Sequence, residues 1–415
     1  MRFGLAATAF VALVIACSSS DPSSNADGSS SSSGGSSGNA SSSGEGGSSS
    51  GSSGNDGSVE PSGPPAIRYV GRFAQSAEGP MCTWPGCRII ARFEGTAISA
   101  SLEEVLEDWM DGAPSEWDVV VDGAVTKKLV MSTGTNDYEL ASGLAAGKHV
   151  VELYKRSETQ DGKTRFRGFD YKGGTLLAPP VAPARKIEIV GDSQPAAFGI
   201  EGVGQGPDCP GNDWAAKYQN FHKSFGARLG EMFDADVNGT VYSGKGFVKN
   251  IWRPDTDTMP LIFGLTDPVD PAGQWDFKWQ PDVVVVMLGG NDFAEGQPDE
   301  SNGGGPATPE AFTAGVDAFA GTLRSKYPQA QIYLALSPSI SDAEPAGRNS
   351  RTNVKAAFTG VANDRTSKGD TKIHFVEPPI AQESELTGCN GHGSPAYHQR
   401  VANDLAAVIK THTGW

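Results

Sequence analysis

The pattern of apolar and polar positions changes near residue 184. Between residues 67 and 175 the apolar stretches are short, as in 89–93 and 149–154, and turn residues separate them. Residues 95–102 alternate with period two, and Asp122-Gly123 between two strand-like stretches is typical of a hairpin turn. The pattern predicts an all-β domain, a β-sandwich of the jelly-roll type.

After residue 184 strand-like and helix-like stretches alternate. Four apolar runs have the length of strands: 186–190, 283–288, 331–336 and 372–376. Two longer stretches have helical character: 309–327 and 395–411. The run at 283–288 is continuous and β-branched, like a strand buried on both faces. We therefore expect βαβ units around a mostly parallel sheet.

A proline-rich connector marks the boundary between the two domains. Residues 176–183 contain three prolines, and proline cannot donate to a sheet ladder. The β-sandwich domain is therefore expected to cover residues 66–183, and the α/β domain residues 184–415.

The first residues have the pattern of a targeting segment. Arg2 precedes an apolar stretch, 3–16, that is too short to span a bilayer, and Cys17 followed by serines ends it. This arrangement resembles a bacterial lipobox, so residues 1–17 are expected to be a lipoprotein signal peptide with lipidation at Cys17. An ordinary signal peptide is the alternative. Both interpretations place the protein outside the cytoplasm, and the first anchors it by lipid to a bacterial membrane.

Residues 18–65 consist mostly of serine and glycine. Such a segment cannot bury enough apolar surface to offset its chain entropy, which predicts a disordered tether. Beside a lipid anchor, a tether would hold the folded domains away from the membrane.

Composition narrows the classes of partner and cofactor. The 415 residues carry a formal net charge of −16, so there is no basic surplus to neutralise nucleic-acid phosphates, and we expect no nucleic-acid partner. Membrane contact is expected only through the lipid anchor, because no later apolar run reaches bilayer length. The histidines and cysteines lack zinc-ligand spacing, so no metal and no other cofactor is expected.

Four polar blocks carry the candidate chemistry. They contain Ser193 in Gly-Asp-Ser, Gly244 in Ser-Gly-Lys-Gly, Asn291 in Gly-Gly-Asn-Asp, and His392 ahead of the closing helix. An esterase needs a nucleophile, a base and donors where the oxyanion develops. Ser193 and His392 would be nucleophile and base. The N–H groups of Ser193 and Gly244 and the Asn291 amide would form the oxyanion hole, although each block alone could be a plain turn or cap.

These four blocks resemble those of the SGNH, or GDSL-type, hydrolases. The β-sandwich domain, residues 66–183, is called the front domain below. It resembles the amino-terminal domain of carbohydrate esterase family 2 in five stretches: 69–73, 84–86, 92–96, 141–144 and 176–180. The resemblance implies a jelly-roll domain packed on an SGNH α/β domain. It also implies metal-independent removal of O-acetyl groups from plant cell-wall polysaccharide of the acetylxylan or acetylglucomannan type.

The histidine block departs from the family pattern. Cys389 stands where many SGNH enzymes carry Asp, and Asn390 where members of this esterase family often do. His392 must hold its proton on Nδ1, and a partner normally fixes that tautomer. Asn390 offers no negative charge, whereas a main-chain carbonyl can accept a hydrogen bond from the Nδ1–H group. We therefore expect a Ser-His dyad oriented by main chain, with Asn390 as the other candidate for orienting the histidine.

The cysteines are expected to form disulfides in an oxidising compartment. With Cys17 lipidated, four cysteines allow three pairings. We expect Cys82 with Cys87 and Cys209 with Cys389, and four buried free thiols are the alternative.

Three tryptophans are weaker candidates for sugar contacts. Trp275 and Trp279 precede the 283–288 strand, and Trp214 lies in the insertion after the nucleophile. Aromatic rings can stack on sugars, but core packing explains these residues equally well. His398, in the closing helix, is expected to pack or cap.

Two other function classes stay open. The protein could be a non-catalytic sugar-binding lipoprotein on a hydrolase fold. The absence of an aspartate in the histidine block would agree with that interpretation. A lipase or thioesterase would use the same SGNH chemistry but needs a long apolar acyl trough, whereas a sugar esterase needs an open, polar cleft.

Overall fold

The computed structural model describes residues 61–107, 114–204, 209–211, 214–253, 255–296 and 304–415. They belong to one compact unit, Val59–Trp415. The predicted signal peptide with Cys17 and nearly all of the predicted tether lie outside the described residues. In the described part of the chain, no helix is both long and apolar enough to cross a membrane.

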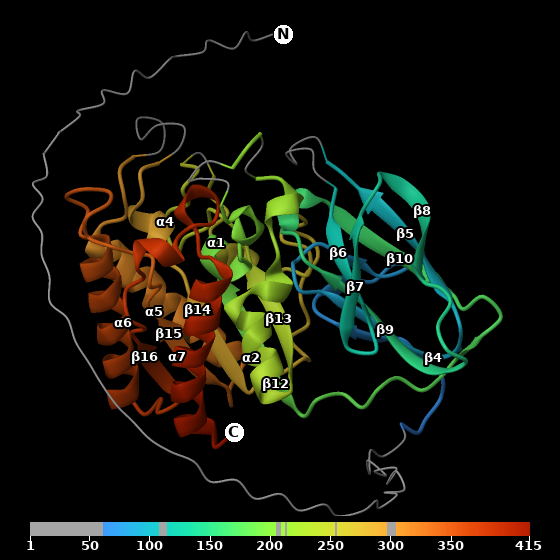
Figure 1. Ribbon diagram of the computed structural model, residues 1–415. Coiled ribbons are helices and arrows are strands. Elements are labelled where there is room, and N and C mark those ends of the chain that lie inside the picture. The colour runs from blue at the N-terminus through green and yellow to red at the C-terminus, as the bar shows by residue number, and fades with distance from the viewer. Residues whose placement is uncertain (1–60, 108–113, 205–208, 212–213, 254, 297–303) are drawn as a thin grey trace, which may run out of the picture. The chain divides into compact units, whose positions relative to one another are not determined.

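Two antiparallel sheets form the front domain (Figure 1). The first has the order β1-β4-β9-β6-β7, with β11 paired to β4: β1 (Arg68–Val70), β4 (Arg88–Gly95), β6 (Glu116–Val121), β7 (Ala124–Val130), β9 (Gly147–Lys155) and β11 (Thr175–Leu176). The second has the order β2-β3-β10-β5-β8: β2 (Phe73–Ala74), β3 (Met81–Cys82), β5 (Ile98–Val105), β8 (Gly134–Ala141) and β10 (Lys163–Asp170). Phe93 and Leu153 of the first sheet share one core with Leu102 and Phe166 of the second. The predicted β-sandwich is thereby confirmed.

Local sequence explains the strand boundaries in this domain. The hairpin β6–β7 turns at Asp122 and Gly123, whose φ angles of 50° and 82° suit Asp-Gly. The predicted strand at 95–102 begins later than expected, because Gly95 ends β4 and β5 starts at Ile98.

Five parallel strands form the sheet of the second domain, in the order β13-β12-β14-β15-β16. Their bounds are β12 (Arg185–Gly191), β13 (Ala235–Val241), β14 (Val283–Met287), β15 (Gln331–Ala335) and β16 (Ile373–Val376). The longer helices are α2 (Phe225–Phe233), α5 (Pro309–Lys326), α6 (Ser350–Ser367) and α7 (Pro395–Thr413), and the single-turn helices are α1 (Ser193–Ala196), α3 (Met259–Ile262) and α4 (Gly290–Phe293). The predicted α/β domain with a parallel sheet is confirmed.

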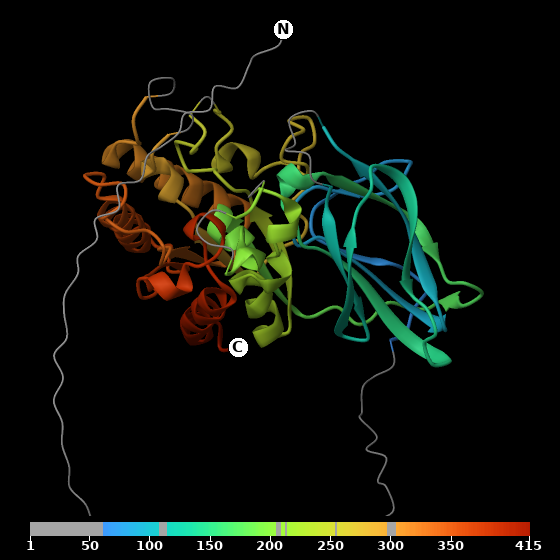
Figure 2. The same cartoon turned by 45° about the horizontal axis from the view of Figure 1, so that its top comes forward.

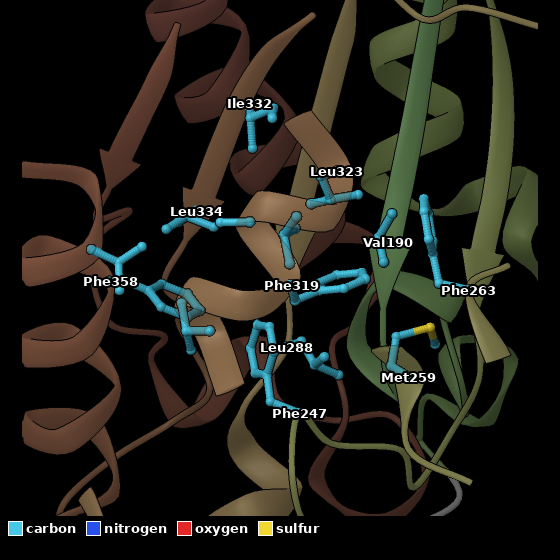
Figure 3. Close-up of a cluster of buried hydrophobic side chains, with 14 of the residues drawn as sticks. Val190, Phe247, Met259, Phe263, Leu288, Phe319, Leu323, Ile332, Leu334 and Phe358 are labelled. Carbon is cyan, nitrogen blue, oxygen red and sulfur yellow. The ribbon is translucent and has the colours of Figure 1, made fainter. Parts of the chain in front are cut away.

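Helices cover both faces of this sheet (Figures 1 and 2). Val284 and Val286 of β14 point into a cluster shared with α5 and α6, whereas Val283 and Val285 point into one shared with α2 and α7. Figure 3 shows the first cluster gathered around Phe319 of α5. All five residues of β14 are buried, which explains the continuous apolar run in its sequence.

A disulfide-closed turn of the front domain inserts into the second domain. The predicted disulfide between Cys82 and Cys87 is confirmed, and Trp84, inside the turn that it closes, is 1% exposed. Trp84 belongs to the hydrophobic cluster of α5 and α6, not to the core of the β-sandwich. Gly86 lies so close to Phe221 that a Cβ would stand 2.6 Å from its ring. The two domains therefore share a core.

Candidate active site

The register of the parallel sheet brings three of the predicted blocks to one edge. Gly191 at the end of β12 pairs with Val241 of β13 on one side and Met287 of β14 on the other. Ser193, Gly244 and Asn291 follow these three strand ends. All three blocks therefore lie at the carboxyl edge, where open α/β sheets bind their ligands.

Ser193 begins α1 directly behind β12. The Asp192 carboxylate caps this helix, because it accepts the N–H of Gln194 at 3.1 Å. Position 191 requires glycine, since a Cβ would stand 2.1 Å from the Met287 carbonyl oxygen. The tight junction of strand and helix leaves Ser193 half-buried at the sheet edge.

His392 contacts Ser193 although the two residues are 199 positions apart. The distance from His392 Nε2 to Ser193 Oγ is 2.8 Å, and His392 Nδ1 lies 2.9 Å from the main-chain oxygen of Cys389. A carbonyl oxygen can only accept, so Nδ1 donates and carries the proton. Nε2 is then the nitrogen that accepts the Ser193 O–H. The Phe198 ring lies against the imidazole, with 4.7 Å between centroids.

A disulfide fixes the loop that carries His392. Cys389 is bonded to Cys209, which confirms the second predicted pairing, and the Cys389 N–H donates to Gly199 O at 3.2 Å. Asn390 is exposed and has left-handed backbone, with φ 53° and ψ 37°. The structure thus places the main chain of Cys389 against Nδ1 of the histidine.

The two predicted oxyanion blocks after β13 and β14 are tied together. The Asn291 amide, in α4, donates to the Lys245 carbonyl oxygen at 2.8 Å. An amide nitrogen carries two hydrogens, so this bond leaves a second donor on the same side chain. Gly244 has a φ of 82°, the left-handed region that favours glycine. The bond to Lys245 therefore joins α4 to the turn that contains Gly244.

Three buried carboxyl groups surround this edge. Burial raises the pKa of Asp192 to about 7 and the pKa of Asp292 to about 6. Asp292 accepts the main-chain N–H groups of residues 247–249 and so anchors the segment after Gly244. Burial also raises the pKa of Glu158, a front-domain residue, to about 7.

Across the described ranges, no group of three or more His, Cys, Asp or Glu side chains could hold a metal ion.

A cavity of about 180 Å³ contains the Ser193–His392 pair. Ten of its fourteen lining residues have polar side chains; the full set is Asp192, Ser193, Gln194, Gly290, Asn291, Ala294, Ser337, Ser339, Ile340, Ser341, Glu344, Pro345, Ser350 and His392. Gly244 is not part of this lining and lies in the neighbouring turn. A volume of this size fits a short acyl group better than a long hydrocarbon chain.

One of the three predicted sugar-contact tryptophans lies near His392. Trp214 packs edge-on against Phe198, with 5.1 Å between centroids, and Phe198 contacts His392. Trp214 is therefore separated from His392 by one ring.

The other two tryptophans are half-buried and contact cationic side chains. The Arg72 guanidinium lies over the Trp275 ring, 5.4 Å from its centroid, and the Lys186 ammonium lies 6.0 Å from that of Trp279. Neither tryptophan lines the cavity beside Ser193. His398 has a packing role, because its Nδ1 accepts the N–H of Phe225 at the start of α2.

Sequence reasoning missed two residues near the site. Trp252 is 49% exposed, and its neighbour Ile251 donates its N–H to Gly244 O at 2.8 Å. Trp252 is close in sequence to the Ser-Gly-Lys-Gly block, and this could have identified it as a candidate. Glu158 binds Ser243 from 85 positions earlier, and no local pattern signals that contact.

Two family models match the chain. One is described as "Carbohydrate esterase 2 N-terminal" and matches residues 69–180. The other is described as "GDSL-like Lipase/Acylhydrolase" and matches residues 187–405. Together they cover both domains.

Similar proteins are found among curated sequences and solved structures. Cellulase/esterase CelE of Acetivibrio thermocellus is 32% identical over 353 residues, which are 85% of this chain but only 40% of CelE. An acetylxylan esterase / glucomannan deacetylase of Cellvibrio japonicus is 26% identical over 338 residues, 80% of this chain and 84% of that protein. The structure of a family two carbohydrate esterase from Clostridium thermocellum in complex with cellohexaose has a TM-score of 0.75 at 31% identity, and the match covers 84% of this chain and all of that one.

Proposed function

The chain belongs to carbohydrate esterase family 2, and we propose that it removes O-acetyl groups from plant cell-wall polysaccharide as a serine esterase. The observation that carries the proposal is the 2.8 Å contact between Ser193 Oγ and His392 Nε2 in a small polar cavity. The names of the relatives support the substrate class. One is named for acetylxylan and glucomannan, and a structural neighbour was solved with cellohexaose.

The reaction follows an acyl-enzyme path. Ser193 Oγ attacks the acetyl carbonyl carbon while its proton passes to His392 Nε2. The negative charge on the former carbonyl oxygen is stabilised by the N–H groups of Ser193 and Gly244 and by the Asn291 amide. The C–O bond to the sugar breaks, and the sugar oxygen takes the proton from His392. Water then gives a proton to His392 and attacks the acetyl carbon. The bond from that carbon to Ser193 Oγ breaks, Oγ takes the proton back from His392, and acetate leaves.

His392 works in this proposal as one member of a dyad. The hydrogen bond from Nδ1 to the Cys389 oxygen supports this role, because it fixes the tautomer that leaves Nε2 as the base. A carbonyl supplies less stabilisation to the imidazolium than a carboxylate would. The oxyanion donors therefore take a larger share of transition-state stabilisation.

The size and polarity of the cavity favour acetyl over long acyl groups. Ser337, Ser339 and Ser341 form one wall, and Ser337 Oγ lies 2.9 Å from Ser339 Oγ. Burying a hydrocarbon chain against these hydroxyls would bring little apolar contact. Trp214 and Trp252 are the proposed aromatic contacts for the sugar chain outside the cavity.

The proposal includes a location outside the cytoplasm, with a lipid anchor at Cys17. It is supported by the sequence of residues 1–17 and by the two disulfides, since disulfides persist in oxidising compartments. Retention of a Cys17→Ala variant in the membrane fraction would contradict the anchor.

The function is tested by measuring acetate release from acetylated xylan and glucomannan. We expect turnover by the natural chain and a loss of about a thousandfold or more in a folded Ser193→Ala variant. Nitrophenyl acetate should be cleaved much faster than the ester of a long-chain acid. Sugar binding without acetate release would indicate a binding protein, and a preference for long acyl chains would indicate a lipase or thioesterase.

A further inference from the structure

A carboxylate of the front domain holds the turn that contains Gly244. Glu158 follows β9, and its side chain is fully buried. Its Oε2 accepts the main-chain N–H of Ser243 at 2.8 Å, and its Oε1 accepts the Ser243 hydroxyl at 2.7 Å. Both oxygens thus bind the residue directly before the proposed oxyanion donor.

The main chain of Glu158 is itself held from both domains. Lys155, also fully buried, donates to the carbonyl oxygens of Ser157 and Glu158 at 3.1 and 3.0 Å. Gln219 of the second domain accepts the Glu158 N–H at 2.9 Å. The carboxylate therefore approaches Ser243 from a rigid support.

Among the described residues, side chains of the second domain hold the other side of the turn. Asp292 holds residues 247–249, and Asn250 Oδ1 accepts the Gly246 N–H at 3.1 Å. On the side of Ser243, the carboxylate that binds the turn belongs to Glu158. A buried carboxyl group is costly to desolvate, so a role in packing alone would be met more cheaply by a neutral side chain.

We propose that Glu158 is a positioning residue for the oxyanion turn, so that the front domain takes part in catalysis. This inference rests on the proposed function. Oxyanion donors act mainly in the transition state, and a displaced Gly244 N–H would stabilise that state less while leaving ground-state binding intact. Loss of Glu158 should therefore lower kcat and leave KM nearly unchanged.

The test compares Glu158→Ala, Glu158→Gln and a matched control, Asp236→Ala. Asp236 is another buried carboxylate at the domain interface; it binds Arg68 at 2.8 Å and lies in β13 away from the Gly244 turn. With nitrophenyl acetate we expect Glu158→Ala to lower kcat by about tenfold to a hundredfold, with KM changed by roughly threefold at most. Glu158→Gln should restore most of the rate, because its oxygen can accept the Ser243 N–H and its amide can donate to the hydroxyl. Asp236→Ala should keep kcat even if the melting temperature falls.

A Glu158→Ala variant with the kcat of the natural chain would overturn the positioning role, as would an equal loss in the Gln and Ala variants. If Glu158→Ala does not fold, Ser243→Ala can be used instead, because it removes the hydroxyl that donates to Glu158 Oε1. An unchanged kcat in that variant would equally overturn the role. Absence of Ser193-dependent turnover in the natural chain would instead contradict the proposed function, so the two failures are distinguishable.

Discussion

At the scale of single residues, the orientation of His392 depends on the main chain. The Cys389 oxygen accepts both the Nδ1 proton and the His392 N–H, at 2.9 and 3.1 Å. A main-chain acceptor cannot be removed by a side-chain substitution. We therefore expect substitutions around His392 to be less damaging than in enzymes that use an aspartate at this place.

Substitution of Asn390 tests this directly. Asn390→Ala should keep most of the activity, whereas His392→Ala should lose nearly all of it. Because Asn390 has positive φ, alanine there should also lower the free energy of unfolding by about 1 kcal/mol, and Asn390→Gly should avoid that cost. Steady-state kinetics and urea denaturation of the three variants separate the two effects. A folded Asn390→Gly variant as inactive as His392→Ala would show that the side chain orients the histidine.

Sequence alone predicted the residues of the site that follow strand ends, but not those that support them. Ser193 and Asn291 stand behind apolar strands, and parallel strands bring such positions together. Glu158 could not be predicted, because its partner lies 85 positions away in another domain and its neighbours are polar. For His392 the sequence predicted a main-chain acceptor but not that it belongs to Cys389, because every residue type carries the same carbonyl group.

At the scale of elements, the histidine loop depends on the disulfide that joins it to the insertion after α1. The Cys209–Cys389 bond closes a loop of 180 positions, whereas Cys82–Cys87 closes one of five. Chain entropy alone would make the first worth about 5 kcal/mol and the second about 2 kcal/mol. Cys389 also provides the carbonyl that accepts the hydrogen bond from His392 Nδ1. The Cys209–Cys389 disulfide therefore affects both the free energy of unfolding and the orientation of the His392 ring.

We expect the double variant Cys209→Ala with Cys389→Ala to lose both stability and kcat. The matched control, Cys82→Ala with Cys87→Ala, should lose less stability and keep its kcat, because that bond is remote from His392. Urea denaturation and nitrophenyl acetate kinetics of both variants provide the measurement. Equal kcat losses in the two double variants would contradict the link between the disulfide and the base.

The elements differ in how well their sequences predict them. The β6–β7 hairpin has a local turn signal, and β14 has an uninterrupted apolar run. Strand β13 contains Asp236, Asn238 and Gly239, yet it is buried throughout. The front domain explains two of these residues, since Arg68 pairs with Asp236 and the Pro85 carbonyl approaches Gly239. Helix α6 was missed although its buried residues follow helical spacing.

At the scale of the whole molecule, a buried ion pair joins the domains. Arg72 of the front domain is 2% exposed and donates to Glu188 of β12 at 2.7 Å and to the Leu265 carbonyl oxygen at 2.9 Å. Thr240 also donates to Glu188, at 2.7 Å. Removing only the cation would leave a buried carboxylate without its counter-charge.

Arg72→Met should therefore lower the free energy of unfolding by about 3 to 5 kcal/mol. The double variant Arg72→Met with Glu188→Gln should recover part of that loss, because the amide oxygen can still accept from Thr240 and no charge stays buried. Urea denaturation of the single and double variants gives the coupling energy. Additive losses would show that the two side chains do not depend on each other.

The Trp84 turn has a consequence for how such genes can be rearranged. A recombination event at the proline-rich connector would join the α/β domain to a different amino-terminal domain. The space that Trp84 occupies in the hydrophobic cluster of α5 and α6 would then be empty. Only a donor that carries an equivalent disulfide-closed tryptophan turn could replace the original one. We therefore expect the two domains to be kept together, and grafting this esterase onto another scaffold should require the transfer of both.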